Sequence, residues 1–90
     1  MAHILNKLDG VKLDDIKRQL KMDAESHAEQ GMYLEHLWRN ADNPDEVYFL
    51  FRVDDLKKCK KFIEKIYAEA SKKNPDAKLP KKIFLEDVKE

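Results

Sequence analysis

The sequence predicts an α+β fold in which two helices cover one face of a four-stranded antiparallel sheet. Its apolar residues form stripes that read strand, helix, strand, strand, helix, strand along the chain. The segment from Val47 to Val53 is apolar on both faces, because residues 47, 49, 51 and 53 alternate with Tyr48 and Leu50. Such a strand needs cover on both sides and therefore belongs at the centre of a sheet.

The first strand is expected from His3 to Leu8, and Asp9-Gly10 turns the chain toward a helix that opens near Leu13. Charged residues occupy one side of that helix. Its apolar side recurs at steps of three and four residues and consists of Leu13, Ile16, Leu20, Ala24, His27 and Ala28. Gly31 is expected to end the helix as a left-handed C-cap.

The second strand is predicted from Met32 to Arg39, and the turn formers of residues 40–45 join it to the 47–53 strand as an antiparallel hairpin. Asp54 or Asp55 then caps the second helix. The apolar stripe of this helix is Leu56, Cys59, Phe62, Ile63, Ile66, Tyr67 and Ala70. Asn74-Pro75 ends the helix, and a last strand is expected from Ile83 to Val88.

This order is the split βαβ pattern of ferredoxin-like domains, and residues 1–90 are expected to form a single domain of that kind. The first and third strands should be central. Because both helices cover the same face, the other face stays bare and carries Tyr48 and Leu50. We expect a second copy of the chain to cover it, giving a homodimer.

Composition excludes several classes of function. Charged residues make up 40% of the chain, but 18 Lys and Arg balance 18 Asp and Glu, so no net field attracts nucleic acid or an anionic membrane. No apolar run approaches the roughly 20 residues that span a bilayer. The one cysteine, Cys59, lies on an apolar helix stripe and is interpreted as a buried thiol. We expect a cytoplasmic protein with no nucleic-acid or membrane partner.

The hairpin and its flanks resemble a known family. The residues that carry the resemblance are Gly31, the run Leu37-Trp38-Arg39-Asn40-Ala41-Asp42-Asn43-Pro44-Asp45-Glu46-Val47, the run Phe51-Arg52-Val53-Asp54-Asp55-Leu56, and Ile83-Phe84-Leu85-Glu86. They are similar to small dimeric α+β barrel proteins related to antibiotic biosynthesis monooxygenases, in particular uncharacterised stand-alone members. The resemblance implies a homodimer whose two sheets form a barrel with the helices outside.

The same superfamily includes cofactor-independent monooxygenases, haem-degrading enzymes, polyketide cyclases and dismutases. No local spacing in this chain reproduces a haem-ligand histidine, and the first strand lacks the Arg-His pair of many stand-alone relatives. The metal-binding patterns His-x-x-x-His and paired cysteines are also missing, as are a Gly-rich phosphate loop and a nucleophile elbow. We expect no cofactor and no metal.

Five residues are candidates for chemistry. His27 lies in the apolar stripe of the first helix, facing the sheet, and could move a proton, although a buried histidine bonded to a carbonyl is the commoner arrangement. His36 and Trp38 share one face of the second strand, and Asn40 follows in phase. Together they could stack on a ring, move a proton and bind an oxyanion. The commoner interpretation is structural, since aromatic residues at period two are ordinary strand formers and Asn before a Pro-containing turn usually bonds its own backbone.

Arg52 is the one charge within the third strand and could clamp a carboxylate or phenolate, or pair with an acid such as Glu35. Three functions therefore stay open. The first is a homodimer of unassigned activity that binds a small organic ligand between sheet and helices. The second is a cofactor-independent monooxygenase or isomerase acting on a small aromatic or polyketide-like compound. The third is a structural or regulatory dimer whose pocket is filled by Met32, Phe62 and Tyr67.

Overall fold

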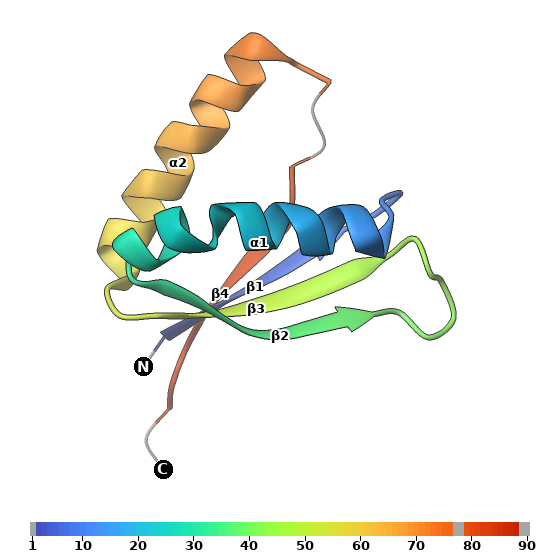
Figure 1. Cartoon of the computed structure of the whole chain (residues 1–90). Coiled ribbons are helices and arrows are strands. Elements are labelled where there is room, and N and C mark those ends of the chain that lie inside the picture. The colour runs from blue at the N-terminus through green and yellow to red at the C-terminus, as the bar shows by residue number, and fades with distance from the viewer. Residues whose placement is uncertain (1, 77–78, 89–90) are drawn as a thin grey trace.

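The computed structural model describes residues 2–76 and 79–88 and has the predicted element order (Figure 1). The strands are β1 (Ala2–Leu8), β2 (Met32–Arg39), β3 (Val47–Val53) and β4 (Lys81–Glu86), and the helices are α1 (Leu13–Glu29) and α2 (Leu56–Lys73). Both helices lie on the same side of the sheet, and no helix or strand formed by the described residues lies on the opposite side (Figure 1). The C-terminal half of α2 rises away from the sheet.

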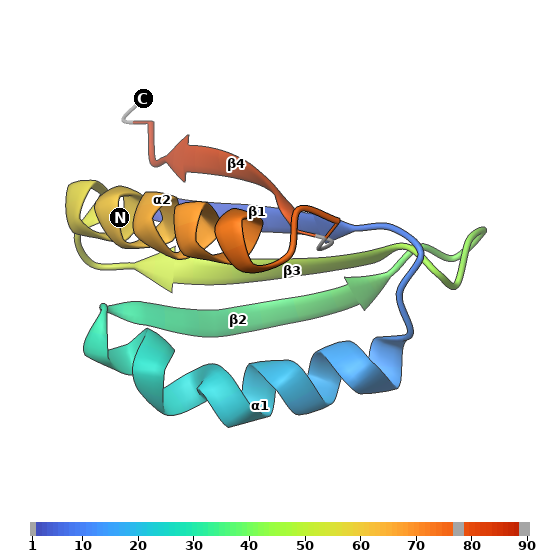
Figure 2. The same ribbon diagram turned by 90° about the horizontal axis from the view of Figure 1, so that it is seen from above.

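All strand pairs are antiparallel, and the strand order is β2-β3-β1-β4, so that β1 and β3 are central as predicted (Figure 2). Asn6 lies in the middle of β1, opposite Phe49 on one side and Lys82 on the other. The β2–β3 ladder is irregular between Leu34 and His36, where β2 contains a bulge. A bulge inserts one extra residue and changes which side chains face each side of the sheet.

The prediction for the last strand was wrong by two residues. It placed the strand at 83–88, whereas β4 is Lys81–Glu86 and pairs with β1 from Lys7↔Lys81 to Ala2↔Glu86. Val88, which the prediction included, is 86% exposed. The prediction started the strand at its first apolar residue and so left out the two lysines before it. A lysine can pair through its main chain in a sheet while its alkyl stem lies along an apolar surface. As a consequence, Lys82 belongs to the sheet.

The core lies between the helices and the facing side of β1 and β3. It consists of Ile4, Leu8, Met32, Val47, Phe49, Phe51, Val53, Cys59 and Ile63. Cys59 is fully buried, as predicted, and its thiol donates to the Gln30 carbonyl oxygen at 3.2 Å. α2 contributes the buried Cys59 and Ile63, whereas α1 contributes no fully buried side chain. α1 therefore covers the sheet loosely.

Both predicted helix boundaries at residues 31 and 54–55 are confirmed. Gly31 follows α1 with φ +71°, a left-handed conformation that favours glycine. At the start of α2 it is Asp55, rather than Asp54, whose side chain accepts a hydrogen bond from the Lys58 backbone N–H at 3.1 Å. Within the described residues, neither helix combines the length and the apolar character that crossing a membrane requires.

Candidate functional site

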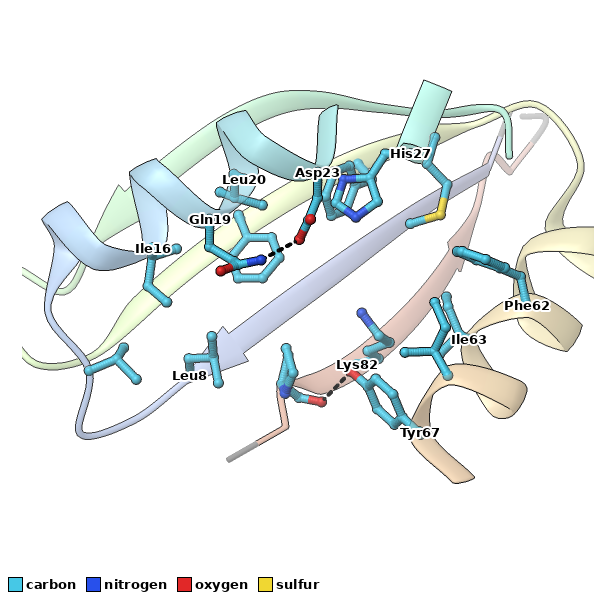
Figure 3. A pocket seen from close by; sticks show the side chains of 16 residues that line it. Leu8, Ile16, Gln19, Leu20, Asp23, His27, Phe62, Ile63, Tyr67 and Lys82 are labelled. Atoms are coloured by element: carbon cyan, nitrogen blue, oxygen red, sulfur yellow. Dashed lines mark hydrogen bonds between the residues drawn. The ribbon is translucent and has the colours of Figure 1, made fainter. Parts of the chain in front are cut away.

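A cavity of about 330 Å³ lies between α1, α2 and the helix-facing side of the sheet (Figure 3). Its apolar wall includes Leu8, Ile16, Leu20, Met32, Phe49, Phe51, Phe62, Ile63 and Tyr67. Met32, Phe62 and Tyr67 line this space and leave it open. The cavity exists because α1 buries none of its side chains completely and α2 diverges from the sheet.

Few polar groups reach this cavity from α1. The His27 ring lies edge-on to the Phe51 ring, with centroids 4.9 Å apart. Burial lowers the pKa of His27 from its usual 6.5, although Asp23 opposes this shift and Lys82 adds to it. His27 is therefore a neutral imidazole at pH 7. One turn earlier, Asp23 accepts a hydrogen bond from the Gln19 amide at 2.7 Å (Figure 3).

Lys82 is the cation of the cavity. Its ammonium group donates to the side-chain oxygen of Asn6 and lies 5.5 Å from the centre of the Tyr67 ring. Asn6 is fully buried, and its amide nitrogen donates to the carbonyl oxygens of Ile4 and Phe49, both at 3.3 Å. These two donor contacts fix the amide so that its oxygen faces Lys82. Burial lowers the pKa of Lys82 to about 8.

Tyr67 closes the side of the cavity formed by α2. Its hydroxyl donates to the Pro80 carbonyl oxygen at 3.1 Å, which ties α2 to the segment that precedes β4 (Figure 3). Burial raises the pKa of Tyr67 to about 12, so the phenol stays neutral at physiological pH. The cavity thus has one carboxylate, one neutral imidazole, one phenol and one ammonium group on a mainly apolar wall.

The other predicted residues lie elsewhere. His36 and Trp38 pair with Leu50 and Tyr48 of β3, and their rings stack with centroids 4.9 Å apart and planes 17° apart. This stack is on the bare face of the sheet, opposite the cavity. Asn40 lies at the hairpin turn, where its side-chain oxygen accepts the Asp42 backbone N–H at 2.9 Å.

Arg52 also lies on the bare face. Its guanidinium carbon is 4.9 Å from the centre of the Tyr33 ring, in a cation–π contact. Glu35 pairs with His3 at 2.9 Å instead of with Arg52. Of the five candidate residues, only His27 lines the cavity, and the sheet separates it from His36, Trp38 and Arg52. Among the described residues, no group of three or more His, Cys, Asp or Glu side chains could hold a metal ion.

Sequence reasoning missed Lys82, Asp23 and Gln19. Asp23 and Gln19 could have been found, since they precede His27 by four and eight residues and so share its helix face. Lys82 could have been found by extending the last strand two residues toward its N-terminus, which puts Lys82 in phase with Phe84. The contact between Lys82 and Asn6 joins the two ends of the chain and has no local signal.

Comparison with known proteins adds evidence about the fold. No protein-family model matches the sequence, and no curated protein matches it. A crystal structure from Deinococcus radiodurans, which carries the provisional name antibiotic biosynthesis monooxygenase, is similar with a TM-score of 0.62 and 13% sequence identity. The match covers 100% of this chain and 95% of that one. This chain therefore shares the βαββαβ fold of that structure, a four-stranded antiparallel sheet with two helices on one face. The predicted fold is confirmed, and the low identity carries no activity across.

Proposed function

We propose that this protein forms a homodimeric α+β barrel in which each protomer binds a small organic ligand in the cavity between sheet and helices. The observation that supports ligand binding is the cavity itself. Binding sites for small molecules are mainly apolar clefts of roughly 300–1,000 Å³ with a few polar groups that fix orientation. A volume of about 330 Å³ is at the small end of that range and suits a compact ligand of one or two rings.

The proposed dimer interface is the open sheet face, which we define as Tyr33, His36, Trp38, Tyr48, Leu50, Arg52, Ile83 and Leu85 together with His3 and Leu5 of β1. Trp38, Ile83 and Leu85 are 46%, 48% and 42% exposed in the protomer. The charges of this face have partners within the chain, since His3 bonds Glu35 and Arg52 lies over Tyr33. An apolar surface whose charged side chains already have contacts within the chain suits self-association.

Ligand binding is tested with a neutral probe, 2-naphthamide, titrated into isotopically labelled protein and followed by NMR. We expect chemical-shift changes at the cavity residues Leu20, Ile63 and Tyr67. Leu20→Trp should abolish them because its ring fills the cavity, whereas Met22→Trp, on the exposed outer side of α1, should not. Changes confined to the open sheet face, or none at all, would refute binding in the cavity.

A second candidate, a cofactor-independent monooxygenase or isomerase, draws support from His27. A neutral imidazole against an apolar cavity can accept the proton of a phenolic substrate, which is the step that prepares such a compound for attack by oxygen. The similarity to the Deinococcus protein is consistent with this candidate. Oxygen uptake would be measured with hydroquinones and anthrones in metal-free buffer. Turnover by the natural sequence that disappears in His27→Gln supports the monooxygenase or isomerase function. If the natural sequence turns over no faster than His27→Gln, this function is excluded.

A further inference from the structure

The cavity contains an ammonium group whose contacts are all with neutral groups. Lys82 bonds the amide oxygen of Asn6 and lies over the Tyr67 ring. Among residues 2–76 and 79–88, no carboxylate oxygen pairs with its ammonium nitrogen within 4.0 Å. A cation in an apolar site normally has an anionic partner, because burial removes the water that would otherwise stabilise its charge.

From this arrangement, and given the ligand-binding function proposed above, we infer that the cavity binds a compact apolar carboxylate, such as a one- or two-ring aromatic acid, whose carboxylate pairs with Lys82. The ligand would supply the negative charge that the chain does not place beside this lysine. Asn6 holds one proton of the ammonium group and leaves two for a carboxylate. Such a charge-assisted hydrogen bond is about twice as strong as a neutral one.

The remaining charges set the orientation of the ligand. Asp23 is carried by α1 beside His27, whereas Lys82 projects from β4 next to Tyr67 and α2 (Figure 3). Asp23 would repel a carboxylate, so the acid group turns toward Lys82 and the ring toward Leu20, Phe51 and Phe62. The hydrogen-bond partner of Asp23 is the Gln19 amide rather than Lys82.

A carboxylic acid fits this site better than a phenol. Carboxylic acids ionise near pH 4, so at pH 7 both the ligand and Lys82 carry their charges before they meet. A phenol ionises near pH 10 and is therefore neutral at pH 7. To pair with Lys82 as an anion it would have to lose its proton at a pH well below its own pKa. Pairing with Lys82 consequently selects the carboxylate.

The pairing also predicts how binding depends on pH. A bound carboxylate favours the charged amine, so affinity is highest below the free pKa of about 8 and falls as the pH rises above it. The titratable groups that face Lys82 come from two elements: Asp23 and His27 from α1, and Lys60, Glu64 and Tyr67 from α2. His27 and Tyr67 keep one protonation state between pH 7 and 10, because their pKa values lie below and above that window.

The experiment compares 2-naphthoate with 2-naphthamide, two probes of equal size that differ in charge, by calorimetry at pH 7 and pH 10. The variants are Lys82→Gln, which removes the charge but can still donate to Asn6, and Lys60→Met, which removes a lysine that lies over Phe84 outside the cavity. We expect the natural sequence to prefer the naphthoate by about tenfold at pH 7. This preference should disappear at pH 10 and in Lys82→Gln, and remain in Lys60→Met.

The two proposals fail differently. If neither probe binds, the ligand-binding function is refuted and this inference falls with it. If both probes bind equally to the natural sequence, the cavity binds ligands and the inference about their charge is refuted. Retention of naphthamide binding by Lys82→Gln shows that the variant is folded. A preference for naphthoate that survives in Lys82→Gln, or that is lost in Lys60→Met, overturns the role of Lys82.

Discussion

Asn6 is the residue on which the polar side of the cavity depends. It is fully buried at the centre of β1, where its amide nitrogen donates to two strand carbonyl oxygens and its oxygen accepts from Lys82. A buried amide is tolerated in a small core when its donors and acceptor all have partners. Asn6 thereby connects the hydrogen bonding of the central strands to the position of the cavity cation.

Replacing Asn6 by alanine should lower the free energy of unfolding by about 1–3 kcal/mol, because Lys82 would lose its acceptor and a small void would form. Urea titration followed by circular dichroism measures the change. Asn43→Ala is the matched control. Its side chain accepts the Asp45 backbone N–H in an exposed turn, and we expect a smaller loss there. Equal losses at both positions would contradict the role given to Asn6.

The half-buried His27 makes stability depend on pH. Because burial lowers its folded pKa below 6.5, the unfolded chain binds a proton more readily than the folded one. The stability linked to this group is fully present above pH 6.5 and is lost as the pH falls through the folded pKa.

An NMR titration of the His27 ring should therefore give a pKa below 6.5, and Asp23→Asn should lower it further by removing a neighbouring negative charge. Asp42→Asn, which removes a negative charge in the exposed hairpin turn, is the control and should leave the His27 pKa unchanged. A His27 pKa that rises in Asp23→Asn would contradict the assigned electrostatics.

At the scale of single elements, the start of α2 is set by one of two adjacent acids. The Asp55 side chain accepts a hydrogen bond from the Lys58 backbone N–H. The Asp54 side chain instead packs against Gly31 at the end of α1, where an added Cβ would lie 3.4 Å from the Asp54 Cβ. The two residues are chemically identical and differ only in their place along the chain. The pair is therefore a matched test of helix capping.

Asp55→Ala should lower the free energy of unfolding by about 1 kcal/mol, since the first turn of α2 loses its side-chain acceptor. Asp54→Ala should change it by less than about 0.5 kcal/mol. Thermal unfolding of the two variants, measured side by side, distinguishes them. A larger loss in Asp54→Ala would show that the helix starts one residue earlier.

At the scale of the whole molecule, the protomer has two unequal sheet faces. The helices cover one of them and leave the cavity, while the open sheet face carries the exposed Trp38 and the half-buried Tyr48 and Leu50. In a symmetric dimer each residue of this face meets the same surface of the partner, so one substitution acts twice. This makes the open face the place where a single charge has the greatest effect on assembly.

We predict a solution mass of twice the 10.6 kDa chain, measured by light scattering or sedimentation. Leu50→Glu or Tyr48→Glu should give monomers at micromolar concentration, because each places an unpaired carboxylate inside the interface. Lys61→Glu, which places the same carboxylate on the exposed side of α2, should leave the dimer intact. A monomeric natural sequence at all accessible concentrations would refute the interface.

Local sequence patterns were enough to predict the order of the elements, the central position of β3, the burial of Cys59, the end of α1 at Gly31 and the start of α2 after Asp54 or Asp55, because these features follow from local periodicity and local hydrogen bonding. They also placed His27 correctly on the inner side of α1. Only the tertiary structure separated His27 from His36, Trp38 and Arg52 and brought Lys82 to Asn6. Those relations depend on which face of the sheet each strand residue occupies and on the β1–β4 register, and both are fixed by pairing between segments distant in the chain.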